Sequence, residues 1–439
     1  MKKIILKSLT TIFFLLLLLS FFLLLSSKKI KKVNVEKDSQ KDINIVQEII
    51  KVNQNDEIDE KFLNWIKINY GDNTLKKIHQ EIKNNHYKEQ LWHDITSNSL
   101  KVLKDKYNNI QLNKKEVKTE NNQVTLSFIG DVSLADNWYI MPKYEERNKK
   151  IYGILSEDIV NELKMSNITV ANNEFTISNR GEKMPGKYYT FRASPNRLSI
   201  YQEMGVDLVT LANNHVYDFG KLAFQDTLES LKQYNIPYIG AGNNLEEAMQ
   251  PYYFIANGYK IAFLNATRAE KIILTPEATA DEGGVFRCYD PSHLINMIKK
   301  TKSQSDFVIT LVHWGKEDSS KLEPVQVDTA KQYIDAGSDL IVGTHAHTLQ
   351  GIDFYNQKAI IYNLGDFIFN NETKDTEIFQ LTINDAGQFQ YKIIPCQQKD
   401  EYTSILNNQE KERVINKIRN LSPNVSITEE GNFFSKNAE

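Results

Sequence analysis

Cysteine is scarce in this sequence, and charge of neither sign is in excess. Cys288 and Cys396 are the only cysteines, and neither lies in a Cys-x-x-Cys pair or beside a histidine, so neither is expected as a metal ligand or a nucleophile. An exported chain would allow them to form one disulfide, which their separation does not decide. The net charge of -3 argues against a polyanion-binding surface and predicts no nucleic-acid partner, although it leaves room for a local basic pocket.

One long apolar run stands near the N-terminus, from about Ile12 to Leu25. With its flanking serines and threonines it approaches the roughly 20 residues that span a bilayer. No Ala-x-Ala-like cleavage site follows, and lysines come soon after the run, which disfavours removal as a signal peptide. Residues 1–32 are therefore expected to form a single-pass membrane anchor; a cleaved signal peptide and a buried core helix are the alternatives. Lysines before the run favour a cytoplasmic N-terminus, so the bulk of the chain is expected to be extracytoplasmic.

The rest of the chain divides by composition into further segments. Residues 33–45 are polar and are interpreted as a tether, and apolar residues at helical spacing over residues 46–108 predict a small helical domain. Residues 109–122 are charged and without apolar rhythm, which indicates a linker. The main domain is expected at residues 123–398, followed by a polar C-terminal tail at residues 399–439 with one weak helix.

Within the main domain, strand-like apolar runs alternate with helical ones from Val124 to about Cys396, and no internal repeat is found. This alternation predicts an α/β sandwich. Two runs near its end, at residues 379–383 and 389–394, are separated by Asn-Asp-Ala-Gly and predict a closing antiparallel hairpin.

Short polar motifs follow several of these apolar runs, at the points where strands should end. They are Gly130-Asp131, Asn213-Asn214-His215, His313-Trp314-Gly315 and His345-Ala346-His347. A parallel sheet would present all of them along the edge at its carboxyl ends, where α/β proteins place their chemistry. Carboxylate, amide oxygen and imidazole groups together suit one or two divalent metals, so a metal-dependent hydrolase or a relative of one is expected.

Several residues of these motifs also have a simple structural explanation. Asp131 is a candidate metal ligand, although Gly-Asp is also an ordinary turn. Asn214 offers an amide oxygen to a metal, unless it and Asn213 only accommodate a strained turn. His215 is expected to donate a proton to a leaving group, and Asp218 to orient it. The histidines of the last two motifs are each as compatible with a structural role as with ligation, but their shared position favours a site; they are His313, His345 and His347.

Other charged residues lie close to these motifs. Glu174, in ANNEF, is expected to bridge or complete a metal site. Glu317, in HWGKE, is expected to support His313 or to contact substrate, or else to be a solvated loop charge. Arg192 is a candidate for binding a phosphate or carboxylate in a forked geometry, and an ordinary surface arginine is the alternative.

The blocks IGDVSL, ANNEF, LVTLANNHVYDFG, TLVHWGKE, IDAGSDLIVGTHAHTLQGID and IYNLGDFIF occur in this order and resemble the CapA family of capsule synthesis proteins. The similarity extends from about Val124 to Phe369. The resemblance implies a calcineurin-like metallophosphoesterase fold, attachment to the membrane with the domain facing outward, and a role in making or exporting poly-γ-glutamate capsule. The implied partners are this anionic polymer or its precursor and other capsule synthesis proteins.

The resemblance also implies residue roles. By motif, His215 takes the general-acid place, and the metal positions are Asp131, Glu174, Asn214, His313, His345 and His347. Asn363 and Asp366 stand in NLGDF where the family reads Ser and Asn, which adds a carboxylate near the site. No histidine lies two residues after Asp131, so one metal position is expected to be weakly held. Manganese, iron and zinc suit the ligand set equally.

These observations predict a membrane-anchored capsule synthesis protein with a divalent-metal site, and they favour hydrolase activity. The alternatives are a non-catalytic polymer-binding or assembly component and an exported metal-dependent phosphoesterase unrelated to capsule. The metal, the substrate and the oligomeric state stay open.

Overall fold

The computed structural model describes residues 44–53, 58–108, 114–119, 122–270 and 274–436. The expected anchor at residues 1–32 lies outside these described residues. Within the described part of the chain, none of the helices combines the length and apolar character that crossing a bilayer requires. The chain divides into two compact units, Met1–Leu100 and Lys101–Glu439.

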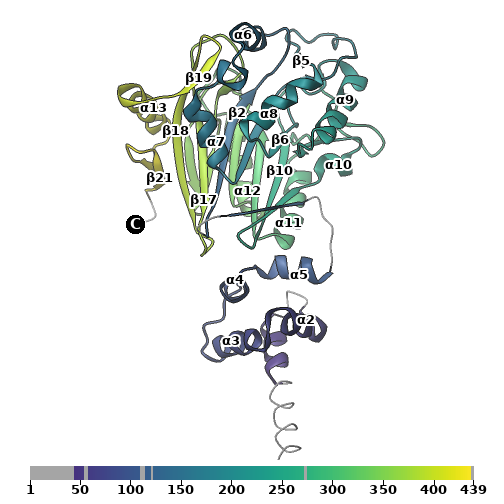
Figure 1. The fold of residues 1–439 in the computed structure, drawn as a ribbon, viewed down its shortest axis with the longest axis vertical. Coiled ribbons are helices and arrows are strands. Elements are labelled where there is room, and N and C mark those ends of the chain that lie inside the picture. The colour runs from purple at the N-terminus through teal and green to yellow at the C-terminus, as the bar shows by residue number, and fades with distance from the viewer. Residues whose placement is uncertain (1–43, 54–57, 109–113, 120–121, 271–273, 437–439) are drawn as a thin grey trace, which may run out of the picture. The chain divides into compact units, whose positions relative to one another are not determined.

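The smaller unit is helical over its described residues (Figure 1). Residues 44–52 are helical, and they are followed by α2 (Glu60–Tyr70), α3 (Asp72–Lys83) and α4 (Gln90–Thr96). Helix α2 begins after Asp59, whose side chain accepts a hydrogen bond of 2.7 Å from the backbone N–H of Phe62. The apolar positions recur every three or four residues and are buried, as the helical spacing requires; they are Phe62, Ile66, Leu75, Ile78 and Trp92.

The boundary between the units falls earlier than residue 108, the end expected from the sequence. Helix α5 (Leu100–Asn108) belongs from Lys101 onward to the larger unit. Its Asp105 forms an ion pair of 2.7 Å with Lys260, whose side chain is almost completely buried. This buried ion pair connects α5 to the larger unit. It joins residues far apart in the sequence, so the spacing of apolar residues does not reveal it.

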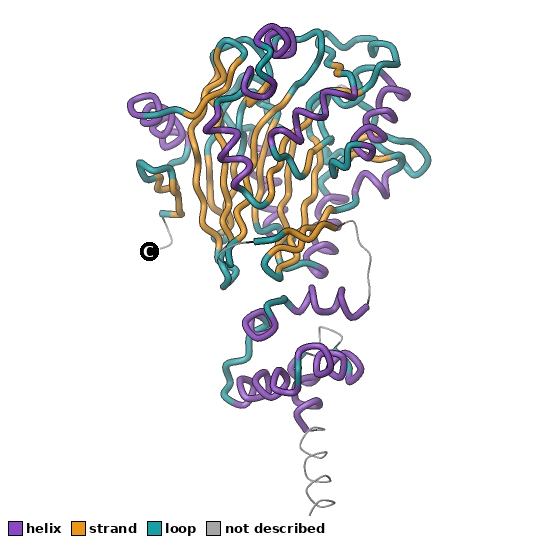
Figure 2. The backbone as a smooth tube through the Cα atoms, in the orientation of Figure 1, coloured by secondary structure: helices purple, strands orange, loops and turns teal. Residues whose placement is uncertain are grey.

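The larger unit contains two large β-sheets, flanked by helices on both outer faces (Figure 2). The first is 7-stranded, in the order β1 (Lys114–Val117), β9 (Tyr252–Ala256), β10 (Tyr259–Thr267), β12 (Phe307–His313), β13 (Leu340–Thr344), β15 (Lys358–Ile361) and β14 (Ile352–Tyr355). The second is 10-stranded, in the order β20 (Val425–Ile427), β21 (Asn432–Ser435), β18 (Phe389–Lys399), β17 (Lys374–Ile383), β2 (Val124–Val132), β3 (Ile168–Asn173), β6 (Leu208–Thr210) and β7 (Tyr238–Ile239), with β16 (Asp366–Ile368) beside β2 and β19 (Tyr402–Ile405) beside β18. Short pairs join β4 (Thr176–Ile177) to β5 (Arg192–Ala193) and β8 (Ala241–Gly242) to β11 (Gly284–Val285).

The unit is thus a mixed α/β sandwich, as the alternation of the sequence predicted. Aromatic and aliphatic side chains of both sheets meet between them: the ring of Phe128 lies 5.5 Å from that of Phe379 and 6.5 Å from that of Phe263. One outer face packs against α7 (Glu157–Met165), α8 (Leu198–Met204) and α9 (Gly220–Gln233), and the other against α11 (Ser292–Gln304) and α12 (Pro324–Asp335). Because both faces of each sheet are covered, the central strands are apolar along almost their whole length. Shorter helices are α6 (Ile140–Arg147) and α10 (Leu245–Met249).

Each of the two large sheets contains a set of parallel strands. Strands β2, β3, β6 and β7 are parallel in one sheet, and β10, β12, β13 and β15 are parallel in the other. The motifs are divided between the two sheets. The carboxyl ends of the parallel strands in both sheets meet at one edge of the sandwich. Apolar strand runs do not encode which sheet a strand joins, so the sequence could not separate the two sets.

Two segments expected to lie outside the domain belong to it. Strand β1, in the expected linker, pairs with the edge strand β9. In the expected tail at residues 399–439, strands β19 and β21 pair with β18, and the amphipathic helix α13 (Asn408–Leu421) buries Val414, Ile415 and Ile418 among core residues. These residues lie three and four apart, so a mainly polar composition concealed one apolar face.

Candidate metal centre

Asp131 is fixed at the end of strand β2 by close backbone packing. A Cβ atom on Gly130 would lie 1.9 Å from the carbonyl oxygen of Gly365, so only glycine fits there. The next N–H, of Asp131, donates a 3.0 Å hydrogen bond to that same carbonyl. The register with β3 shifts between Ile129 and Asp131, and such an irregularity redirects a side chain at a strand end. The Asp131 carboxylate is completely buried at the edge where the two sheets meet.

The His345-Ala346-His347 segment follows β13 in an unusual backbone conformation. His345 has φ 96 and His347 has φ 53, values that bulky residues rarely adopt. Such strain persists where the surrounding structure enforces it, commonly at functional sites. The N–H of His345 lies 3.2 Å from Asp131 Oδ2, and His347 Nδ1 lies 2.7 Å from Asp366 Oδ1, so both ends of the segment are held by carboxylates.

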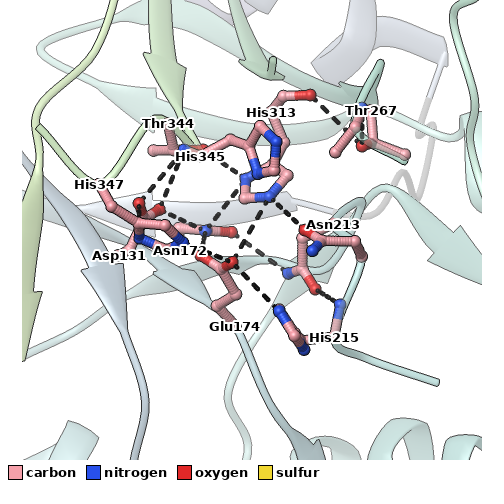
Figure 3. Close-up of polar contacts among 12 residues, drawn as sticks. Asp131, Asn172, Glu174, Asn213, His215, Thr267, His313, Thr344, His345 and His347 are labelled. Atoms are coloured by element: carbon pink, nitrogen blue, oxygen red, sulfur yellow. Dashed lines mark hydrogen bonds and ion pairs between the residues drawn. The ribbon is translucent and has the colours of Figure 1, made fainter. Parts of the chain in front are cut away.

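Glu174 lies at the centre of the site, directly after β3 (Figure 3). Its Oε1 atom is 3.7 Å from His313 Nε2, 3.8 Å from His347 Nε2 and 4.0 Å from His215 Nε2. This oxygen is buried and has no hydrogen-bond partner among the residues that the structure describes. Several imidazole nitrogens therefore surround a carboxylate oxygen that no described residue satisfies.

Two groups of possible metal ligands share this carboxylate. One consists of Glu174, His313 and His345, and the other of Asp131, Glu174 and His347. In each group the ligand atoms lie within 4.8 Å of one another. Asn214 adjoins the first group, because its Oδ1 lies 2.8 Å from His313 Nε2. The structure thus brings together all the metal positions expected from the sequence.

The cluster holds groups whose charges conflict. Burial, followed by the negative charge of Asp131, raises the pKa of Glu174 well above its ordinary value. Burial disfavours the proton on His347, but the carboxylates of Asp366 and Glu174 outweigh it and raise the pKa of His347 well above its ordinary value. Without a bound cation, the cluster therefore retains protons to balance its buried carboxylates.

The remaining histidines respond in the opposite way. Burial, and then the positive charges of His345 and His347, lower the pKa of His313 well below its ordinary value. Burial and the charge of His347 lower the pKa of His345 to about 3. Neutral imidazoles are the form that binds metal, and His345 Nδ1 is another buried atom for which the described residues offer no hydrogen-bond partner. The donor set and its unsatisfied atoms fit one or two divalent cations.

His215 lies beside these ligand groups and is oriented by a carboxylate. Its Nδ1 atom is 2.8 Å from Asp218 Oδ2, which leaves Nε2 facing Glu174. The Asn213 side chain accepts hydrogen bonds from the backbone N–H groups of His215 and Val216 at 2.9 and 3.0 Å. Asn213 therefore shapes the turn that presents His215.

Arg192 and Glu317 are not brought to the cluster by any described contact. The guanidinium of Arg192 lies 4.1 Å from the centre of the Phe219 ring and donates to the carbonyls of Arg180 and Gly181. Glu317 is exposed, and among the described residues it has no hydrogen bond to His313. His313 Nδ1 instead lies 2.9 Å from the hydroxyl of Thr344. Contact of either residue with substrate stays a prediction.

Sequence reasoning missed two residues that support the site. Asn172 Nδ2 lies 2.8 Å from Asp131 Oδ1 and 3.1 Å from Glu174 Oε2, so one amide links the carboxylates of both ligand groups. Lys187 forms an ion pair of 2.8 Å with Asp218. Asn172 lies in the quoted ANNEF block and its strand-end position was a usable signal, whereas Lys187 lies in a loop with no pattern that marks it.

A family model described as "Bacterial capsule synthesis protein PGA_cap" matches residues 125–371, more than half of the chain. The chain belongs to this family. The family expected from the motifs is thereby confirmed, and the matched range contains every strand end of the cluster.

Two similar proteins have names that refer to capsule or PGA biosynthesis. The capsule biosynthesis protein CapA of Bacillus anthracis is 30% identical over 288 residues, which cover 63% of this chain and 68% of that protein. The PGA biosynthesis protein CapA of Bacillus subtilis (strain 168) is 28% identical over 286 residues, which cover 64% of this chain and 73% of that protein.

Solved structures show weaker similarity to this PGA_cap protein. The 5′-nucleotidase from Candida albicans SC5314 matches with a TM-score of 0.33 and 12% identity, covering 64% of this chain and 52% of the nucleotidase. This chain thus spans about half the length of that enzyme. The protein TT1561 of Thermus thermophilus matches with a TM-score of 0.30 and 8% identity, covering 61% of this chain and 97% of that one.

Proposed function

We propose that this protein is a membrane-anchored, extracytoplasmic component of poly-γ-glutamate capsule biosynthesis or export, whose larger unit binds divalent metal and hydrolyses an ester or amide bond. Membership of the PGA_cap family and similarity to the two CapA proteins support the capsule role. The apolar run from about Ile12 to Leu25 and its lysine flanks support the anchor. The two-sheet sandwich, with its ligands at one edge, supports a calcineurin-like metallophosphoesterase fold.

The unsatisfied Oε1 atom of Glu174 carries the metal part of this proposal. A buried carboxylate oxygen without a partner is costly, and three imidazole Nε2 atoms lie about it at 3.7 to 4.0 Å. Glu174, His313, His345 and Asn214 would hold one cation, and Asp131, Glu174 and His347 a second. A bound divalent ion would supply Lewis-acid activation of the substrate and of water.

His215 has the position and orientation of a proton donor to the leaving group. The hydrogen bond from Nδ1 to Asp218 fixes the imidazole, so that a proton on Nε2 faces the centre of the cluster. A donor held in this way typically contributes about 10²- to 10⁴-fold to rate. Asp218 has the role of orienting the ring.

The experiment that tests this proposal combines two assays on the full-length protein. The metal-reconstituted protein is incubated with a phosphomonoester, a phosphodiester and poly-γ-glutamate, and binding of poly-γ-glutamate is measured separately by calorimetry. Metal-dependent cleavage that is lost in Glu174→Gln but retained in Glu412→Gln supports the hydrolase; Glu412 is an exposed glutamate on α13. Binding of the polymer without cleavage of any substrate contradicts hydrolysis and favours the polymer-binding alternative.

A further inference from the structure

Lys187 is a buried cation behind the candidate metal centre, on the segment between β4 and β5. Its side chain is only 4% exposed, and the Asp218 side chain that it contacts is 0% exposed. An ammonium group in such a place is costly unless it is paired and fully hydrogen-bonded. Lysine therefore needs a specific reason to occupy this position.

The contacts of Lys187 join three separate loops. Its Nζ atom lies 2.8 Å from Asp218 Oδ1, 3.0 Å from Glu270 Oε1 and 2.9 Å from Thr275 Oγ1. It also donates to the backbone carbonyl of Asn214, the residue whose side-chain oxygen lies against His313. An ammonium has three N–H donors, so these acceptors use its hydrogen-bonding capacity completely.

Asp218 is shared between Lys187 and His215. Its Oδ1 atom faces Lys187, while its Oδ2 atom faces His215 Nδ1 at 2.8 Å and accepts a 2.8 Å hydrogen bond from the backbone N–H of Phe191. The ring of Phe191 in turn lies 4.5 Å from the imidazole of His215. The carboxylate is thus held from three directions, and the imidazole cannot rotate without breaking these contacts.

We propose that Lys187 is a positioning residue that, through Asp218, holds the imidazole of His215 with Nε2 directed at the substrate. The purpose of this orientation rests on the proposed function, whereas the contacts of Lys187 do not depend on that function. Lys187 also neutralises two buried or nearly buried carboxylates, Asp218 and Glu270, which would otherwise face each other across the same site. Its removal should release the loop from Asn214 to Asp218.

The test uses the full-length, metal-free chain with ¹⁵N only in its 8 histidines. The Nδ1–H signal of His215 is assigned by its loss in His215→Ala, and its exchange with water is measured by NMR. In Lys187→Met we expect this signal to disappear or its exchange to become about tenfold faster or more, because a charge-assisted hydrogen bond has lost its support. Lys260→Met is the matched control, since Lys260 is also buried and paired with an aspartate, Asp105.

An unchanged, slowly exchanging signal in Lys187→Met would overturn the proposal, as would an equal loss in Lys260→Met. If Lys187→Met does not fold, Lys187→Gln removes the charge while keeping a polar group. The same two results for this variant would overturn the proposal. The signal is read without substrate or metal, so a protein without hydrolytic activity still tests the role of Lys187. Where activity is found, Lys187→Met should lower kcat more than it raises KM, because the proton donor acts in the chemical step.

Discussion

Glu174 Oε1 and His313 Nε2 lie 3.7 Å apart at the junction of the two sheets, and within the described part of the chain the carboxylate oxygen has no hydrogen-bond partner. Glu174 follows β3 of one sheet, whereas His313 ends β12 of the other. The separation is too long for a hydrogen bond but suits two ligands of one ion, since metal–ligand distances are about 2 Å. The sandwich therefore holds two ligands near each other without letting them satisfy each other.

Glu174→Gln should abolish metal binding and yet leave the metal-free protein as stable as before, or more stable. The raised pKa of Glu174 means that this carboxyl favours its neutral form when folded, and glutamine resembles that form. Glutamine removes the possibility of a buried negative charge but keeps a polar group there, so any gain in stability should not exceed about 1–3 kcal/mol. Melting temperatures with chelator and with added manganese check this: metal should stabilise the parent alone, and stabilisation of the variant by metal would contradict it.

His215→Ala should keep the metal and lose turnover. His215 belongs to neither ligand group, so metal content should stay within about twofold, while kcat should fall about 10²- to 10⁴-fold. Elemental analysis and initial rates on the same samples measure both quantities. Loss of metal from this variant would instead make His215 a ligand and remove its assigned role.

Metal affinity should rise with pH as His347 loses its proton. Burial lowers the pKa of His347, but Asp366 and Glu174 raise it further, to well above its ordinary value, so at neutral pH a proton competes with the metal for Nε2. Asp366→Asn weakens this preference for the proton, so the pH at half-maximal affinity should fall. Calorimetric titrations at a series of pH values around and above neutrality test this.

The matched control for that titration is Asp375→Asn, which removes a carboxylate that pairs with Arg413 and Lys417 on α13. Its pH profile should match that of the parent. An Asp366→Asn profile that also matches the parent would show that Asp366 does not tune His347.

Removal of residues 400–439 should destabilise the larger unit severely. Val414, Ile415 and Ile418 are almost completely buried, and each buried aliphatic side chain contributes about 1.5–3 kcal/mol. The truncation also removes β19 and β21, the partners of β18. Thermal unfolding of this truncated chain should be broad or absent, whereas a chain ending at Lys436 should unfold like the parent. Equal melting temperatures of the two truncated chains would show that residues 400–436 are a tail outside the domain.

The elements of the site could be predicted because they follow apolar strands. Asp131, His313 and His345 each stand where a hydrophobic run stops, and the structure places each at the carboxyl end of a strand, as this pattern requires. The closing hairpin was likewise predicted from two alternating runs and a turn, and β17 and β18 form it with longer strands.

What could not be predicted depends on contacts between distant segments. Membership of one sheet or two is decided by packing across the sandwich, which the local apolar pattern of a strand does not carry. Lys187 is recognisable only once folding places Asp218, 31 residues away, beside it. The ion pair between Lys260 and Asp105 and the packing of α13 against the core also depend on contacts between segments far apart in the sequence.

The measurement that tests the account most directly is the metal content of the full-length protein after exposure to manganese, iron and zinc, compared with a variant carrying His313→Ala and His347→Ala. These substitutions remove one histidine from each ligand group that shares Glu174. We predict one or two bound ions per chain in the parent and loss of most of that metal in the folded variant. No bound metal in a well-folded parent, or an equal metal content in both proteins, would contradict the metal centre and the hydrolytic function built on it.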